Sequence, residues 1–359
     1  MSDERDERGA DLAFGPACPV PISSHTNLLL AHGGGGRLTR ELVDRLIAPA
    51  FANSLLAPLH DGARIDAGGA RLAFTTDSFV VHPLFFPGGD IGSLAVHGTV
   101  NDLAMCGARP LALSCGLILE EGLAMATLER VVASLAAAAR AAGVPIATGD
   151  TKVVDRGKGD GVYINTAGIG LVPDGIEIDP KRARPGDVVL VSGTLADHGV
   201  AILSVREGLE FESPIVSDSA ALWTLVAPLL ERLGARLHVL RDPTRGGAAA
   251  ALEEIAGQAG AGIRLDESSI PVAEAVRGAC EILGLDPLHV ANEGKLLAIV
   301  ARDAAEEALA LLRAHPLGTA AAVIGEVVDA HRGQVAVRSA IGGLRLVDIP
   351  AGEPLPRIC

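Results

Sequence analysis

The sequence predicts an α/β protein built from two mixed α/β domains. The chain has 359 residues, which is long enough for two domains of ordinary size. Segments that favour strands and segments with helical periodicity alternate in both halves, as is typical of α/β domains. Hydrophobic residues make up 49% of the chain but aromatic residues only 3%, so we expect a large core of Ala, Val, Leu and Ile.

The first half reads as one domain, over residues 26–175, after a flexible leader at 1–25. A polar stretch at 173–185 with three prolines marks its boundary with a second domain at 185–350. The elements expected in the first half are a helix over 38–51, a strand over 72–76 that ends at Asp77, a helix from an N-cap at Ser93 to 107, a strand over 110–119, a helix over 127–142 that Gly143 closes, a strand over 144–148 that leads into Asp150, and a strand over 162–172.

The second half starts with a strand over 187–191 and continues with alternating helices and strands. We expect helices near 244–259 and 303–314 and strands near 296–301 and 322–328. The chain then ends in residues 351–359, which we interpret as a mobile tail. Pro354 and Pro356 exclude a helix there and favour an extended course that carries Cys359 at its tip.

Composition excludes several classes of function. The net charge of −14 and the lack of a Lys/Arg block argue against a nucleic-acid surface. No apolar run approaches the roughly 18 residues that span a bilayer, and the start of the chain is unlike a signal peptide, so cytoplasmic residence is the expectation. The five cysteines form no C-x-x-C pair, so neither a disulfide framework nor a zinc cluster is indicated.

A run of four glycines precedes the first expected helix and is the first candidate ligand site. Consecutive backbone N–H groups at a helix start can converge on an anion such as a phosphate. A flexible turn would have the same composition, and no Gly-Lys-Ser/Thr follows as in a Walker A loop. The run, which follows His32, is Gly33, Gly34, Gly35 and Gly36.

Three aspartates occupy places where a carboxylate is unusual. Asp77 and Asp150 each follow strand-like residues, and Asp102 falls with Asn101 inside an otherwise apolar helix. Each could be a cap or turn residue. Together they could hold Mg2+, which needs few carboxylates and leaves room for water and phosphate oxygens.

Four further features carry possible chemistry. Lys152, directly after Asp150 and Thr151, could neutralise phosphate or act as a base, although a solvated surface lysine would look the same. The segment 241–247, which contains Asp242, and the triplet 292–294, which contains Glu293, each precede regular structure and could equally be turns. Cys359 could be a reachable thiol or an accident of a disordered end.

In combination, these residues make the chain resemble the HypE family, the carbamoyl dehydratases of nickel–iron hydrogenase maturation. The resemblance covers about residues 27–359, and it rests on eight motifs in order. They are HGGGGR at 32–37, TTDSF at 75–79, FPGGDIG at 86–92, VNDLA at 100–104, GDTKVV at 149–154, DPTRGG at 242–247, NEG at 292–294 and the terminal PRIC at 356–359.

The resemblance implies a fold and an activity. The family belongs to an ATP-binding superfamily with aminoimidazole ribonucleotide synthetase, so it implies two α/β domains of that type and a homodimer whose N-terminal sheets join into a barrel. It also implies ATP and Mg2+ at the domain cleft. The carbamoyltransferase HypF would load a carbamoyl group onto Cys359, the enzyme would dehydrate this S-carboxamide to a thiocyanate, and the HypC–HypD complex would accept the cyano group.

The resemblance also implies roles for single residues. Asp77, Asp102 and Asp150 match the magnesium–nucleotide carboxylates, and Asp242 matches a fourth. The glycine run 33–36, which is part of the first motif, is expected to bind the nucleotide. Lys152 and Glu293 match residues near the thiocarboxamide, with Glu293 as the expected base and Lys152 as an orienting or relaying group. The alternative is a small-molecule kinase or selenophosphate synthetase-like enzyme of the same superfamily, which would have no use for Cys359.

Overall fold

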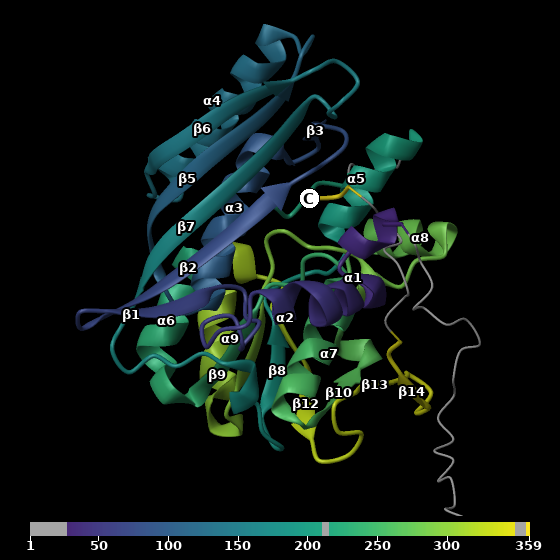
Figure 1. Cartoon of the computed structure of the whole chain (residues 1–359). Coiled ribbons are helices and arrows are strands. Elements are labelled where there is room, and N and C mark those ends of the chain that lie inside the picture. Colours follow the sequence, from purple (N-terminus) through teal and green to yellow (C-terminus); the bar gives the residue numbers. More distant parts are fainter. Residues whose placement is uncertain (1–26, 210–214, 349–356) are drawn as a thin grey trace, which may run out of the picture.

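A computed structural model of the chain describes residues 27–209, 215–348 and 357–359 (Figure 1). The leader predicted at 1–25, with Cys18, and the tail residues 351–356 lie outside the described residues. The prediction of two mixed α/β domains is confirmed, with a five-stranded sheet in the first half and a seven-stranded sheet in the second. Within the described ranges, no helix is long and apolar enough to cross a membrane.

The N-terminal sheet has the strand order β1-β2-β7-β5-β6 and is antiparallel except between β5 and β6. Its strands are β1 Ala63–Ala67, β2 Ala70–Phe79, β5 Arg109–Glu120, β6 Ile146–Val154 and β7 Val162–Val172. Helices α3 (Ile91–Met105) and α4 (Met125–Ala141) pack against each other, and α3 lies on one face of the sheet (Figure 1). Among the residues that the structure describes, no helix covers the other face of this sheet, and two of the predicted site residues point to that open face.

Helix α3 forms because its residues are apolar on almost every side. Most of its side chains are buried between the sheet and the second domain, as expected for a helix that is hydrophobic all round. Its N-cap is Asp90 rather than the predicted Ser93. The Asp90 carboxylate accepts from the N–H groups of Gly92 and Ser93, while the Ser93 hydroxyl bonds back to Asp90, so Ser93 is the second member of a capping box.

The expected strand ends at Asp77 and Asp150 were also wrong. Strand β2 continues past Asp77 to Phe79, because residues 77–79 pair with β7. Strand β6 runs through Asp150 to Val154, because β5 pairs with it along that length. Both aspartates therefore lie inside strands, and the direction of each side chain follows from the alternation of the strand.

The C-terminal sheet has the order β14-β13-β10-β12-β8-β11-β9. Its strands are β8 Val188–Val191, β9 Leu237–Arg241, β10 Gly262–Asp266, β11 Leu297–Val300, β12 Ala322–Val328, β13 Val335–Arg338 and β14 Leu344–Leu346. The helices of this half are α5 Asp197–Glu207, α6 Trp223–Leu233, α7 Gly247–Ala259, α8 Glu274–Leu283 and α9 Ala305–Arg313. The strands and helices predicted in this half are present.

The two halves share one continuous core. A single cluster of buried side chains includes residues of α3, of α6 and of the last residues of the chain. Asn101 of α3, one of the two polar residues predicted to need a partner, accepts from the N–H of Leu222 at 2.8 Å and donates to the carbonyl of Ala220 at 3.0 Å. It therefore joins α3 to the segment before α6, while its neighbour Asp102 is left for another role.

Two segments complete the domain junction (Figure 1). The helix predicted over 38–51 is present as α1 Arg37–Leu42, a π-helical turn Val43–Ile47 and α2 Ala48–Ala50, and it lies across the C-terminal half. The end of the chain lies between the end of β2 and helix α5.

We expect Asp90→Ala to lower the stability of the N-terminal half, because two backbone N–H groups at the start of α3 lose their acceptor. Loss of an N-cap costs about 1 kcal/mol. The midpoint of thermal unfolding should fall by about 2–4 °C. Asp90→Asn keeps an oxygen at the same place, so its unfolding midpoint should fall less. Equal midpoints for the unmodified protein and both variants would contradict the capping assignment.

Candidate active site

Three carboxylates meet where β2, α3 and the end of β9 come together. They belong to Asp61, Asp102 and Asp242, and one oxygen from each lies within 4.8 Å of the others. Asp61 precedes β1, Asp102 lies on α3 and Asp242 follows β9. The Thr75 hydroxyl on β2 donates to Asp102 at 2.7 Å, and the Arg241 guanidinium lies 2.7 Å from Asp61.

Burial and mutual repulsion disfavour the charged form of these carboxylates. Burial, and then the charges of Asp242, Asp61 and Asp77, raise the pKa of Asp102 well above its usual value. Burial and the neighbouring Asp61 raise the pKa of Asp242 to about 8. Arg241 offsets only part of this effect at Asp61, whose pKa burial also raises. A cation placed among the three carboxylates would remove the repulsion.

The three residues fit a divalent cation such as Mg2+. Carboxylate oxygens are the ligands that Mg2+ prefers, and the buried Oδ2 of Asp61 has no hydrogen-bond partner in the described part of the chain. Sequence reasoning missed Asp61, because Asp-Gly before a strand is typical of a turn. A cavity of about 410 Å³ opens beside the group, lined in part by Gly35, His60 and Arg241.

Asp77 lies near the three carboxylates, on the helix-covered face of the sheet. Its pKa is raised by burial and lowered in part by the charge of Arg245, and its own charge raises the pKa of Asp102 and Asp242. The structure therefore brings three of the predicted carboxylates, Asp77, Asp102 and Asp242, into one neighbourhood.

The predicted glycine run packs against the segment that contains Asp242. Gly35 has φ +76°, and a Cβ there would lie 2.9 Å from the Cβ and 3.1 Å from the carbonyl oxygen of Arg245. Only glycine fits this approach without displacing the opposite backbone. Helix α7 begins two residues later, at Gly247. The two glycine-bearing loops that the sequence singled out therefore lie together at a helix start.

Glu293 and Cys359 meet in the same cleft. The Glu293 carboxyl is buried, and its pKa is raised well above the usual value, first by burial and then by the charges of Asp242, Asp77 and Asp218. A hydrogen bond from the side chain of Cys359 lowers the pKa in part. Within the described ranges, the other carboxyl oxygen, Oε1, has no hydrogen-bond partner. The last residue of the chain thus rests against the residue that was expected to act as the base.

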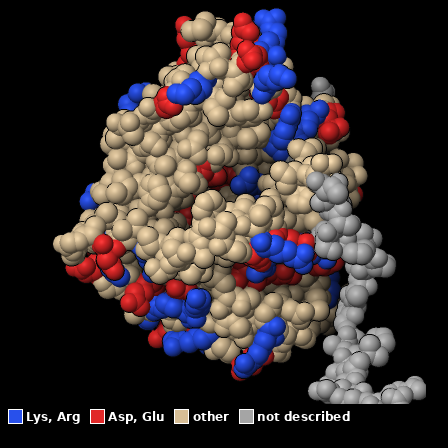
Figure 2. All heavy atoms as spheres, in the orientation of Figure 1, with Lys and Arg blue, Asp and Glu red and all other residues tan. Residues whose placement is uncertain are grey.

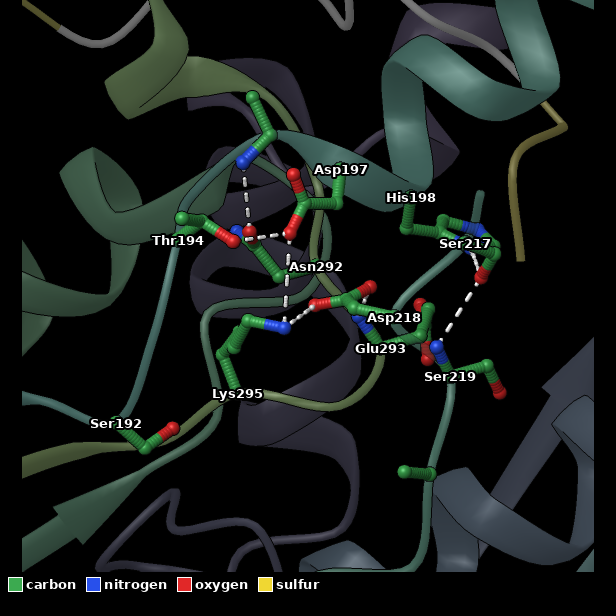
Figure 3. Close-up of polar contacts among 12 residues, drawn as sticks. Ser192, Thr194, Asp197, His198, Ser217, Asp218, Ser219, Asn292, Glu293 and Lys295 are labelled. Atoms are coloured by element: carbon green, nitrogen blue, oxygen red, sulfur yellow. Dashed lines mark hydrogen bonds and ion pairs between the residues drawn. The ribbon is translucent and has the colours of Figure 1, made fainter. Parts of the chain in front are cut away.

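A second group of charged residues lies next to Glu293, and sequence reasoning missed it (Figure 3). Asp218 accepts from the Glu293 N–H at 3.1 Å and lies 3.3 Å from the ammonium group of Lys295, which is 3.7 Å from Asp197. Lys295 is 11% exposed and Asp218 2%. The lysine two residues after Glu293 resembled an ordinary residue before a strand, so only the fold reveals this pairing.

Asp150 and Lys152 lie elsewhere in the chain. They pair with Gly116 and Ile118 of β5 and so point to the sheet face without helices, away from Asp77 and Asp102. Both are largely exposed, and the Lys152 ammonium lies 2.6 Å from the Asp150 carboxylate, whose pKa this contact lowers. One chain alone does not bring Asp150 to the other carboxylates or Lys152 to Cys359.

The space-filling view shows a hollow on one face of the molecule (Figure 2). Acidic side chains and a basic one lie at the bottom of a hollow in the middle of the face shown in Figure 2, near the end of the chain. The rim is mostly uncharged. Such a hollow, with buried titratable groups and a nearby cavity, is the usual form of an active site.

The two-domain fold and its site agree with the protein class that family comparisons identify. Residues 59–172 match the N-terminal domain, and residues 184–338 the C-terminal domain, of AIR synthase related proteins. A relative in Cupriavidus necator, described as carbamoyl dehydratase HypE, is 57% identical over 331 residues, which is 92% of this chain and 94% of that protein. The chain belongs to the HypE family of carbamoyl dehydratases.

Two solved structures are similar over most of the chain. A crystal structure of a HypE–HypF complex contains a chain that is 48% identical, with a TM-score of 0.82, over 86% of this chain and 99% of that one. A structure of the hydrogenase maturation protein HypE in complex with ATP is 54% identical, with a TM-score of 0.79, over 93% of this chain and 100% of that one.

The buried carboxylates predict a pH and metal dependence of stability. A carboxyl whose pKa is raised by folding favours the folded state while it is protonated, and this contribution is lost as the carboxyl ionises. With a chelator present, the free energy of unfolding should therefore fall as pH rises from about 4 through about 8. Asp102→Asn removes one buried charge and should weaken this fall. Mg2+ should raise the unfolding midpoint of the unmodified protein at pH 8 by a few degrees but not that of the variant.

Asp329→Asn is the matched control, because Asp329 is an exposed aspartate far from the group. It should respond to Mg2+ as the unmodified protein does. An equal Mg2+ effect in Asp102→Asn would show that the ion binds elsewhere.

Proposed function

We propose that the chain dehydrates an S-carboxamide on its own Cys359 to a thiocyanate with the consumption of ATP, and so supplies the cyanide ligand of the nickel–iron hydrogenase iron centre. The observation that carries the proposal is the contact between the side chain of Cys359 and the buried Glu293, beside the carboxylates of the nucleotide site. A small-molecule kinase would have no reason to hold its own C-terminus there.

The chemistry explains the arrangement. An amide oxygen is a poor leaving group, so the carboxamide oxygen first attacks the γ-phosphate of ATP and releases ADP. The C–O bond then breaks, phosphate leaves with that oxygen, and the nitrogen gives up two protons as the C≡N bond forms. Glu293 is the proposed base for the nitrogen, because a raised pKa makes its carboxylate a good proton acceptor.

Asp61, Asp102 and Asp242, with Asp77 close by, would hold Mg2+, which supplies charge neutralisation at the phosphates. The glycine run 33–36 and the loop at 245–247 would surround the phosphate chain. The buried cleft excludes water from the phosphorylated intermediate, which would otherwise return to the carbamate.

The open face of the N-terminal sheet is the proposed homodimer surface. Phe74, Ile118 and Ile169 are each at least 36% exposed there, and the area over β2, β7 and β5 is largely without charged side chains (Figure 2). Two such sheets packed face to face would form a barrel. Asp150 and Lys152 point to the same face, so we assign them to a second copy, where Lys152 would orient the carboxamide.

The proposed partners follow from the family. HypF would load the carbamoyl group onto Cys359, the HypC–HypD complex would accept the cyano group, and the reaction would take place in the cytoplasm. The tail must therefore leave the cleft for loading and for delivery, and return to it for dehydration.

The test is mass spectrometry of the peptide 348–359, which cleavage before Asp348 releases, after incubation with HypF, carbamoyl phosphate and ATP. The peptide should gain a carbamoyl group and then lose the mass of one water only with hydrolysable ATP. Glu293→Gln should still be loaded but should dehydrate at least about a hundredfold more slowly. Glu281→Gln, at an exposed position on α8, is the control. A tail that never carries the group would refute the proposal.

For the dimer surface, we expect Ile118→Glu to give monomers in sedimentation velocity, because the new charge would be buried between two sheets. Ile282→Glu replaces an isoleucine that is 78% exposed on α8 and should leave the dimer intact. If Ile118→Glu sediments as the unmodified protein does, the two copies meet through another surface.

A further inference from the structure

The last three residues of the chain are held by their backbone. The Arg357 carbonyl accepts from the His82 N–H at 3.1 Å, and the Cys359 carboxyl accepts from the Val80 N–H at 3.1 Å. Residues 80–82 directly follow β2, so the tail lies along them as an added strand segment would. Peptide groups alone would accept any tail sequence, and they leave its register open to slippage.

Ile358 supplies an anchor between these two contacts. Its side chain is 1% exposed and belongs to the core that both domains share. Its carbonyl oxygen lies 2.8 Å from Nε2 of His198 on α5. The residue next to the reactive cysteine is therefore fixed by both its side chain and its peptide group.

The surroundings of His198 set which ring nitrogen carries the proton. The Ile358 carbonyl can only accept, so Nε2 carries the proton and donates to it. In the neutral ring Nδ1 is then an acceptor, and it lies 2.7 Å from the Ser217 hydroxyl, which donates to it and accepts from the Ser219 N–H (Figure 3). Burial lowers the pKa of His198, which keeps the ring neutral and so preserves this division of roles.

The same loop also holds the proposed base. Asp218, between Ser217 and Ser219, accepts from the Glu293 N–H, and a Cβ at Gly294 would lie 1.7 Å from the Asp218 carbonyl oxygen. The loop at 217–219 thus fixes His198 on one side and Glu293 on the other. A tail held by His198 is therefore placed relative to Glu293 through one short segment that contacts both residues.

We propose that His198 is a positioning residue that fixes the register of the docked tail, so that the group on Cys359 faces Glu293. The purpose of this positioning rests on the proposed dehydration, but its test by alkylation of Cys359 does not. A slip of one residue would move the sulfur by about 3.3 Å and turn the side chain to the other face. His198 prevents it by binding the one carbonyl that lies between the two strand-like contacts.

Arg206, about two turns further along α5, is a second residue that holds the tail. Its Nη2 donates to the carbonyls of Arg357 at 2.8 Å and His82 at 2.7 Å, and so joins the tail to residues 80–82. Arg357 has φ +58°, a conformation that a non-glycine residue keeps only when its surroundings hold it. Arg206 and an ion pair from Arg357 to Asp160 at 2.9 Å hold it there.

The experiment measures how fast iodoacetamide alkylates Cys359, read from the mass of the peptide 348–359. His198→Leu removes the donor, and we expect alkylation to become about tenfold faster, because the Ile358 carbonyl loses its buried partner. His198→Gln can still donate to that carbonyl, so its alkylation rate should lie between those of the unmodified protein and His198→Leu. Loading by HypF should not slow in either variant, whereas dehydration of the loaded protein should slow in the same order.

His238→Leu is the matched control, because His238 is also buried and bonded, to Asp187 at 2.7 Å, but lies away from the tail. It should leave the alkylation rate unchanged. If His198→Leu does not fold, Ser217→Ala and Arg206→Gln test the same contacts and should each accelerate alkylation. An unchanged alkylation rate in folded variants would overturn the proposed positioning role of His198. Absence of dehydration in the unmodified protein would instead refute the proposed function and leave the alkylation result standing.

Discussion

The rest of the site depends on the burial of Glu293 among other acidic groups. A carboxyl in this place resists ionisation, because water is excluded and Asp242, Asp77 and Asp218 are near. The raised pKa makes the ionised carboxylate of Glu293 a stronger proton acceptor than that of a solvent-exposed glutamate. The Glu293 side chain accepts a hydrogen bond from that of Cys359. Two of these acidic neighbours, Asp242 and Asp77, also belong to the proposed nucleotide site, so nucleotide and metal binding there would be electrostatically coupled to proton acceptance by Glu293.

The two-domain fold is what makes this burial possible. Helix α3 brings Asp102 from the N-terminal half, β9 brings Asp242 from the other, and the loop at 217–219 brings Asp218 to the back of Glu293. Lys295 balances Asp218 and Asp197 close by. Ile358 and Cys359 pack into the core that both halves share, so the proposed substrate group on Cys359 would lie against the buried side chains that exclude water.

Much of the fold could be predicted from the sequence, because hydrophobic periodicity and glycine placement depend on local chain geometry. The alternation of elements and the polar pair inside α3 were both visible in the sequence. Strand ends were not, because pairing with β7 and β5 extends β2 and β6 beyond Asp77 and Asp150. Asp61, Lys295 and His198 were missed for a common reason: each has an ordinary local sequence and gains its role from a partner distant in the chain.

The most direct measurement of the central claim follows the oxygen of the carboxamide. Cys359 would be loaded with a carbamoyl group whose oxygen is a heavy isotope, and one turnover with ATP would be analysed for the isotope in inorganic phosphate. Attack of the carboxamide oxygen on the γ-phosphate predicts one labelled oxygen in each phosphate released. Label that appears in water, with unlabelled phosphate, would contradict the account, because the oxygen would then have left without being phosphorylated.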